Sequence, residues 1–431
     1  MKLSRVLPAT LALAGLVPGA FALDATTRTL HHSKAAPLVQ PRRAVKHAAT
    51  TSAAKAAAPQ AKAATRISRS AGKGASSVRR AGLGVRRHRY YERFTASSFA
   101  TSDIFAGDNT TGEDPIVRQA AIDALAGMNG TAVVINPANG RILAMVNQKL
   151  ALSPGAEPCS TIKLTVAMAA LSEGLVTRDT MVQLPGFRMN MTQALAKSNN
   201  LYFEELGREL GFNRVRRYAN EFGLGELAGY NIQGEQLGVY PDEALPEKEG
   251  GVGRMCSFGQ GVSMTPLQLG AFVAALANGG TLYYLQHPTT LDEVAGFEPR
   301  VKRTLDIARY VPDMQDGMAG AVEYGTARSL RASFTELPVF GKTGTCSDKG
   351  TRFGWFASYS EAPVGGLVTV FFLEGGRPTF GPRAAELTGA FYRNLWDHNY
   401  FADKSQTTAT LTPVPTTLES RPAVPAQDIN Q

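Results

Sequence analysis

The feature that most limits the possible folds of this chain is the order of its secondary-structure patterns. Strand-like runs occur at both ends of the segment 131–374, and helical patterns lie between them. Residues 131–146 contain two β-rich runs around a Pro-Ala-Asn-Gly turn, which predicts an antiparallel hairpin. Three further strand-like runs follow much later, at 338–345, 353–360 and 366–374. The sequence therefore predicts an α+β fold, in which distant segments form one antiparallel sheet and a helical insert lies between them.

The helical patterns between the strands carry recognisable ends. Residues 161–174 are apolar at helical spacing and close on a glycine. A later helix has Thr265 as its N-cap, Pro266 at its first position and Gly279 just past its end. A last helix is expected over 384–399, after the final strand.

Positive charge is concentrated ahead of this segment. Residues 24–93 carry sixteen Lys or Arg against two acidic residues, and Lys2 and Arg5 add two more cations, so residues 94–431 carry a net charge of −7. The basic stretch is rich in Ala and Ser and lacks apolar periodicity, which predicts a disordered tether over 23–104. It would either bind an anionic membrane surface or acidic wall polymer, or serve only as a solvated linker.

The ends of the chain predict export and a second disordered region. Residues 1–22 combine a basic start, a short apolar run and an Ala-Phe-Ala cleavage site, as in a secretory signal peptide. An uncleaved anchor is the alternative, but the apolar run is shorter than the ~20 residues that span a bilayer. Export argues against nucleic acid as the partner of the basic stretch. Residues 403–431 are Thr- and Pro-rich and predicted to be disordered, which leaves 105–402 as the folded domain.

Histidine offers little to a catalytic mechanism here. Four of the six histidines lie in the basic stretch, and only His287 and His398 fall in the folded segment, so a Ser-His-Asp triad is not expected. There is no Cys-x-x-Cys and no histidine pair at helical spacing, so we expect neither a metal site nor a cofactor.

Lysine is the remaining candidate for a base. Ser160 and Lys163 lie three residues apart at the start of an apolar helix, so both side chains should share one face. The amine can accept the hydroxyl proton only if its pKa falls from ~10.4 toward neutrality. The pattern therefore predicts that Lys163 is buried near another cation. The same spacing at Ser52 and Ser70, within the tether, shows that spacing alone is weak evidence.

Two further motifs strengthen this interpretation. Ser198-Asn199-Asn200 supplies a hydroxyl that can relay protons and an amide that can orient a peptide bond. Lys342-Thr343-Gly344-Thr345 supplies a cation, hydroxyls for a carboxylate and a glycine that lets a substrate lie along a strand. The order Ser-x-x-Lys, Ser-x-Asn, Lys-Thr-Gly is typical of penicillin-binding proteins and serine β-lactamases.

On these motifs the sequence resembles the transpeptidase domain of penicillin-binding proteins, over about residues 131–398. The segments GELAGYNIQGEQLGVYP, GQGVSMTPLQLGAFVAALANGG and EYGTARSL extend the likeness beyond the three motifs. The resemblance implies an antiparallel sheet flanked by helices, an all-helical subdomain and an active site between them.

The resemblance also implies a role for each motif residue. Ser160 would be the acylated nucleophile and Lys163 its base, Ser198 would pass a proton to the leaving amine, and Asn200 would bind the substrate amide. The Lys342-Thr343-Gly344-Thr345 strand would supply a cation and hold the terminal carboxylate. The implied substrates are peptidoglycan stem peptides ending in D-Ala-D-Ala, which the enzyme would cross-link, and β-lactams would acylate Ser160 instead. Asn199 is expected to be structural.

Two cysteines flank these motifs. Cys159 precedes the nucleophile and Cys346 follows Lys-Thr-Gly-Thr. Similar paired cysteines form a disulfide in carbapenem-hydrolysing class A β-lactamases, so the resemblance implies a Cys159–Cys346 bond in an oxidising compartment. The alternative is two small buried thiols. Cys256 would stay free, as a core residue.

The alternatives differ in what happens to the acyl-enzyme. A serine β-lactamase or a D,D-carboxypeptidase would pass the acyl group to water, and a β-lactam or wall-fragment sensor would keep it. Hydrolysis needs a base, and Glu235 is the best-placed acidic candidate, although its surroundings favour a structural role. Trp355 is expected to fill the core. The basic tether and the short interval between Ser160 and Ser198 depart from the large members of the family.

Overall fold

The computed structural model describes residues 94–362 and 365–402. The signal peptide predicted over 1–22, the tether up to residue 93 and the tail over 403–431 lie outside the described residues. Within the described part, no helix has both the length and the apolar character to cross a membrane.

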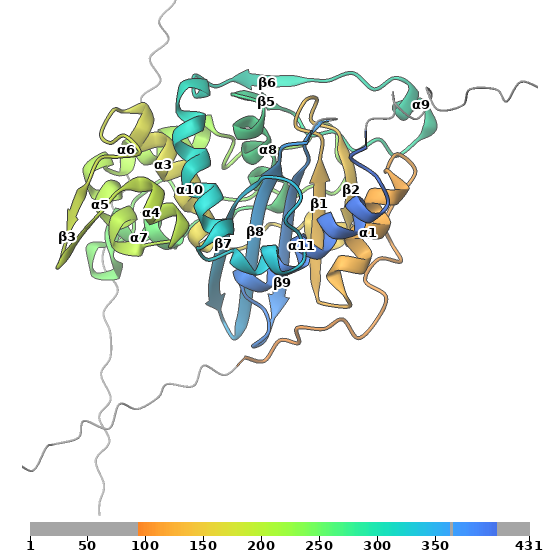
Figure 1. The fold of residues 1–431 in the computed structure, drawn as a ribbon, viewed down its shortest axis with the longest axis horizontal. Helices are drawn as coiled ribbons and strands as arrows, with labels where there is room; N and C mark the ends of the chain where they lie inside the picture. The colour runs from red at the N-terminus through yellow and green to blue at the C-terminus, as the bar shows by residue number, and fades with distance from the viewer. Residues whose placement is uncertain (1–93, 363–364, 403–431) are drawn as a thin grey trace, which may run out of the picture. The chain divides into compact units, whose positions relative to one another are not determined.

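A five-stranded antiparallel sheet forms the centre of the described domain (Figure 1). Its strands are β1 (Gly130–Ile135), β2 (Ile142–Val146), β7 (Val339–Asp348), β8 (Thr351–Ser360) and β9 (Val368–Gly375), in the order β2-β1-β9-β8-β7. Each neighbouring pair is antiparallel. The predicted hairpin and the predicted sheet of distant segments are therefore confirmed, and β7 lies at one edge.

Successive side chains along each strand point to opposite faces of the sheet, so the core has two layers, one on each face. Val133 and Phe372 belong to one buried cluster, whereas their neighbours Val134 and Phe371 belong to the other. Helix α8 (Pro266–Ala277) packs in the first layer, and α1 (Pro115–Leu125) and α11 (Gly381–Asp397) pack in the second. Both faces of the sheet are therefore covered by helices.

The ends of these helices follow from local chemistry. Thr265 caps α8 and Pro266 occupies its first turn, as predicted, and the structure adds a capping box between Thr265 and Gln268. Helix α11 starts at Gly381, three residues earlier than expected, because Pro382 fits the first turn of a helix, where its missing N–H is not needed.

A helical part lies beside the β7 edge of the sheet (Figure 1). It contains α3 (Lys163–Ser172), α4 (Met191–Ala196), α5 (Asn200–Leu210), α6 (Phe212–Glu221) and α7 (Gly251–Phe258), and α10 (Val311–Glu323) packs against both α4 and β7. Close packing of α5 on α7 requires Gly207, because a Cβ there would lie 2.6 Å from Cys256 Sγ. Cys256 is buried and free, as predicted.

Short elements connect these parts. They are η1 (Cys159–Ile162), η2 (Glu247–Glu249), η3 (Ala308–Tyr310), η4 (Arg328–Ala332), α2 (Gln148–Ala151), α9 (Leu291–Ala295) and the two small sheets β3 (Val182–Leu184) with β4 (Phe187–Met189) and β5 (Thr281–Tyr283) with β6 (Val301–Thr304).

The packed chain begins before residue 105, where the sequence places the end of the tether. Ser98 Oγ lies 2.9 Å from Thr379 Oγ1 and accepts a hydrogen bond from Gly376 N, and Phe99 bridges to Met128. Residues 94–104 therefore pack on the domain. Five of these eleven residues are apolar, but the backbone and hydroxyl hydrogen bonds that hold the segment leave no periodicity in the sequence.

Candidate active site

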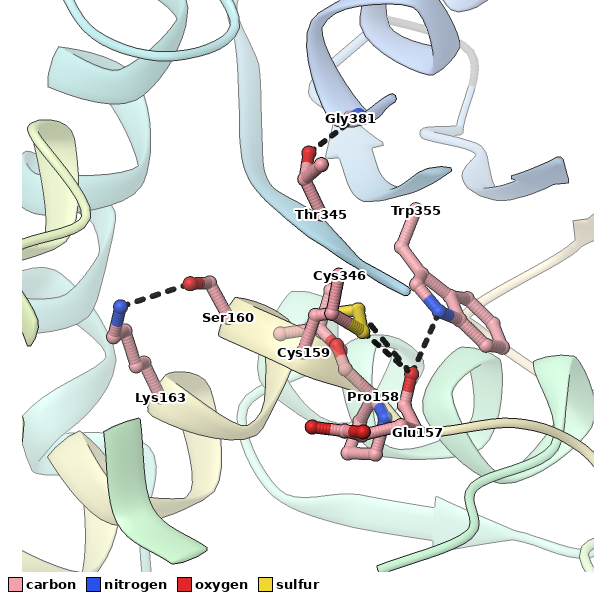
Figure 2. The surroundings of a disulfide bond; sticks show 10 residues. Glu157, Pro158, Cys159, Ser160, Lys163, Thr345, Cys346, Trp355 and Gly381 are labelled. Carbon is pink, nitrogen blue, oxygen red and sulfur yellow. Dashed lines mark hydrogen bonds between the residues drawn. A yellow bond between two sulfur atoms is a disulfide. The ribbon is translucent and has the colours of Figure 1, made fainter. Parts of the chain in front are cut away.

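Ser160 and Lys163 meet where a short 3₁₀ turn leads into α3. Ser160 lies on η1 and Lys163 is the first residue of α3, whereas the sequence predicts that one α-helix carries both. In a 3₁₀ turn, side chains at i and i+3 nearly eclipse each other, so the tighter turn brings the two groups closer. Ser160 Oγ lies 2.8 Å from Lys163 Nζ (Figure 2).

Lys163 is fully buried among oxygen atoms. Besides Ser160, its Nζ lies 3.0 Å from Ser198 O, 3.2 Å from Ser198 Oγ and 2.6 Å from Asn200 Oδ1. Burial, followed by the nearby Lys342 cation, lowers the pKa of Lys163 well below its ordinary value. Both conditions that the sequence predicts for this lysine, burial and a neighbouring cation, are present. A neutral amine here can accept the Ser160 proton.

Ser198, in the turn before α5, and Asn200, the first residue of α5, both contact this lysine. Asn199 caps α5 by accepting a hydrogen bond from Tyr202 N, which confirms its structural role. Ser198 has a φ of 53°, a left-handed conformation that is unfavourable for a serine and directs its side chain into the site. The Asn200 oxygen is occupied by Lys163, which leaves its Nδ2 group to donate elsewhere.

Lys342 completes a series of polar groups. It lies on the edge strand β7, is fully buried, and its Nζ donates to Ser198 Oγ over 2.9 Å and to Thr343 O over 3.0 Å. Burial lowers the pKa of Lys342 to about 7. Ser160, Lys163, Ser198 and Lys342 thus follow one another within hydrogen-bonding distance, from the helical part to the sheet.

The rest of the Lys-Thr-Gly-Thr segment shapes the gap between η1 and β7. A Cβ at Gly344 would lie 2.8 Å from Pro158 O, so only glycine allows this approach. Thr343 and Thr345 alternate with Lys342 and Gly344 along the strand. Thr345 Oγ1 accepts a hydrogen bond from Gly381 N, so its hydroxyl proton is free to be donated to a substrate oxygen (Figure 2).

Thr326 is a site residue that sequence reasoning missed. Its Oγ1 lies 2.6 Å from Thr343 Oγ1, and its N–H donates to Ala196 O, just before the Ser198 turn. It falls in the EYGTARSL segment that the resemblance includes. A threonine between α10 and β7 has no distinctive spacing, so only the likeness of the whole segment could have pointed to it.

Cys159 and Cys346 form a disulfide, with Cα atoms 5.5 Å apart (Figure 2). Trp355 Nε1 donates to Glu157 O over 3.1 Å beside it. The Trp355 ring is fully buried and stacks on Phe372, as expected for a core residue. The disulfide links η1 to β7 at the residue before Ser160 and the residue after Thr345.

Glu235 has a structural environment. Its carboxylate accepts hydrogen bonds from the N–H groups of Ala228 and Gly229. Burial raises its pKa, which these backbone donors and the Lys302 charge partly oppose. The Glu235 carboxylate therefore links the two ends of the loop 228–235, which is the structural role that the sequence favours.

Replacing Glu235 with alanine is expected to lower the free energy of unfolding by about 1–3 kcal/mol, because two backbone N–H groups lose their acceptor. Urea unfolding measures this loss. The lifetime of a penicillin adduct should stay the same. A longer-lived adduct in the variant would instead identify Glu235 as a base for deacylation.

Within the described residues, no group of three or more His, Cys, Asp or Glu side chains could hold a metal ion.

Comparison with known proteins agrees with this geometry. Residues 130–389 match the family model of the penicillin binding protein transpeptidase domain. Stage V sporulation protein D of Bacillus subtilis (strain 168) is 31% identical over 258 residues, which cover 50% of this chain and 39% of the relative. Peptidoglycan D,D-transpeptidase MrdA of Acinetobacter baumannii is 26% identical over 307 residues, which cover 57% of this chain and 45% of the relative. The chain therefore spans less than half the length of these curated relatives.

Solved structures share the fold. The TP domain of penicillin-binding protein 3 from Burkholderia pseudomallei aligns with a TM-score of 0.57 at 18% identity, over 67% of this chain and 96% of that one. PBP2 of Pseudomonas aeruginosa, in complex with WCK 5153, aligns with a TM-score of 0.55 at 24% identity, over 68% of this chain and 78% of that one. The family model covers more than half of the chain, and this chain belongs to the penicillin-binding protein transpeptidase family.

Proposed function

We propose that this chain is a peptidoglycan D,D-transpeptidase that forms an acyl-enzyme on Ser160 and cross-links stem peptides ending in D-Ala-D-Ala. The observation that carries the proposal is the series of groups from Ser160 through Lys163 and Ser198 to Lys342, each within hydrogen-bonding distance of the next. A buried amine of lowered pKa in contact with a serine hydroxyl is the arrangement that an activated nucleophile requires.

In the acylation step, Ser160 Oγ attacks the carbonyl carbon of the penultimate D-Ala while its proton passes to Lys163 Nζ. The negative charge on the carbonyl oxygen is stabilised by the N–H groups of Ser160 and Thr345, each contributing about 3 kcal/mol to the transition state. The carbon–nitrogen bond then breaks, and the terminal D-Ala leaves as an amine that receives its proton through Ser198. An ester on Ser160 remains.

In the second step, the amine of another stem peptide attacks this ester. It loses a proton to the same relay, Ser160 Oγ regains a proton, and a new peptide bond links the two stems. The Asn200 amide binds the donor peptide, Thr343 and Thr345 hold the terminal carboxylate, and Lys342 supplies the nearby positive charge. A β-lactam presents a carboxylate and a reactive amide in the same relation and acylates Ser160 in place of the peptide. No cofactor takes part.

A β-lactamase, a D,D-carboxypeptidase and a sensor differ from this proposal only after acylation. Transfer to water needs a base that faces the acyl-serine, and Glu235, the acidic residue considered for that task, is occupied by the N–H groups of its own loop. This observation supports slow hydrolysis of the acyl-enzyme, and hence transfer to an amine.

Peptidoglycan lies outside the cytoplasm, so the proposal includes export by the signal peptide over 1–22. The basic stretch over 23–93 would hold the enzyme near an anionic membrane surface or an acidic wall polymer. No nucleic acid is involved.

Intact-mass spectrometry of the protein after addition of benzylpenicillin tests the proposal. A stable adduct of one drug mass on Ser160 is expected, and Ser160→Ala should abolish it. The variants Ser52→Ala and Ser70→Ala, which alter the same spacing in the tether, should keep the adduct. Labelling that survives Ser160→Ala would overturn the assignment, and rapid loss of the adduct with consumption of the drug would indicate a β-lactamase.

A further inference from the structure

A cavity of about 500 Å³ lies apart from the site described above. Its wall includes the turn at 230–233, residues between Gln286 and Arg300, and the first residue of α2. None of the residues assigned to acylation or to carboxylate binding lines it. The volume falls within the range of about 300–1,000 Å³ that is usual for small-molecule sites.

The wall of this cavity is held in place by backbone and side-chain hydrogen bonds. Gln286 O accepts from Ile142 N and Gln286 Nε2 donates to Glu298 O, each over 2.8 Å. Tyr230 N donates to Leu285 O over 2.8 Å. The cavity is therefore formed before any ligand binds, so little free energy is lost in ordering its wall.

The charges of the wall indicate which ligands it suits. Glu293 accepts hydrogen bonds from Thr289 N and Oγ1, and His287 Nε2 lies 3.0 Å from the buried Glu113 carboxylate. Arg300 stacks on the Tyr230 ring, 4.1 Å from its centre, and no carboxylate within 94–362 or 365–402 forms an ion pair with it. One unpaired guanidinium beside a carboxylate does not suit a multiply charged anion such as a nucleotide.

The remaining polar lining groups are mostly carboxamides, and aromatic rings and aliphatic side chains complete the wall. Asn231 and Gln233 are exposed, and their side chains bond to no other part of the described chain. Tyr230, with Arg300 stacked on its ring, and Phe297, with Arg141 5.5 Å from its ring centre, add apolar ring surface. Neutral donors and acceptors combined with apolar ring surface match a ligand that offers hydroxyl groups, acetamido groups and an apolar ring. N-acetylated sugars have this combination.

We infer that this cavity binds N-acetylated sugars of a glycan strand, at a site separate from Ser160. The inference rests on the proposed function, because the sugars of peptidoglycan are N-acetylated and carry the stem peptides. The guanidinium of Arg300 and the amides of Asn231 and Gln233 bond the acetamido and hydroxyl oxygens.

Isothermal titration calorimetry of the full chain with chitotetraose, a β-1,4-linked tetramer of N-acetylglucosamine, tests the inference. We expect binding at one site, with the same affinity before and after Ser160 is acylated by benzylpenicillin. The double variant Gln233→Ala, Arg300→Ala should bind at least tenfold more weakly. A matched control, Gln183→Ala with Arg188→Ala on the exposed β3–β4 hairpin, should bind as the wild type does, and unfolding temperatures show that both variants are folded.

Three outcomes would overturn the inference. The first is that chitotetraose does not bind at millimolar concentration. The second is that maltotetraose, which lacks acetamido groups, binds equally well. The third is that acylation of Ser160 abolishes binding, which would place the sugar at Ser160. Failure of the proposed function is distinguishable, since it would appear as absent acylation while the sugar still binds.

Discussion

Replacing Lys163 with alanine is expected to slow the acylation of Ser160 by benzylpenicillin by a factor of about 100 to 10,000, the contribution typical of a positioned base. The Lys163 amine is the one basic nitrogen within hydrogen-bonding distance of Ser160 Oγ in the described part of the chain. Rapid-quench mass spectrometry of the adduct gives the rate. Lys149→Ala, which removes an exposed lysine on α2, is the control and should leave the rate unchanged. An equal rate in the Lys163 variant would exclude this residue as the base.

The pH dependence of the same rate follows from the lowered pKa of Lys163. Below that pKa the amine is an ammonium ion and cannot accept the Ser160 proton. The rate should therefore rise with pH through the lowered pKa and reach a plateau well below 10.5, the ordinary value for lysine. A rate that keeps rising to a midpoint near 10.5 would show that burial and Lys342 do not act on Lys163 as the structure implies.

Removing the disulfide is expected to lower the free energy of unfolding by about 2–5 kcal/mol. The bond joins residues 187 positions apart, so its loss frees a long loop in the unfolded chain. Urea unfolding of the Cys159→Ser, Cys346→Ser double variant, against the wild type with and without dithiothreitol, measures the loss. Reductant should destabilise the wild type and leave the variant unchanged.

The same variant should also acylate more slowly, because the bond lies between the residue before Ser160 and the residue after Thr345. Cys159 has a φ of 52°, an unfavourable backbone conformation for a non-glycine residue, and the cross-link helps to hold it. Without the bond, the two N–H groups that would stabilise the carbonyl oxygen lose their fixed separation. A peptide map with free thiols at both cysteines, or a wild type indifferent to reductant, would contradict the prediction.

Much of the fold could be predicted because its signals are local. Short runs rich in β-branched and aromatic residues mark β1, β8 and β9, and the Thr265 cap with Pro266 marks the start of α8. Signals of this kind depend only on residues that are close together in the sequence. The packing of residues 94–104 could not be predicted, because it depends on partners such as Thr379 and Met128, which are distant in the sequence.

The sequence by itself determined which residues are candidates for the chemistry and in which order they occur, since each motif is contiguous and its spacing depends on local geometry. Only the tertiary structure decided how the motifs meet. The 3₁₀ turn at Ser160, the place of Ser198 between Lys163 and Lys342, and the contact of Thr326 with Thr343 arise from packing between the helical part and the edge of the sheet. The pKa of each lysine depends on burial and on charges distant in the sequence, so it is a property of the folded chain alone.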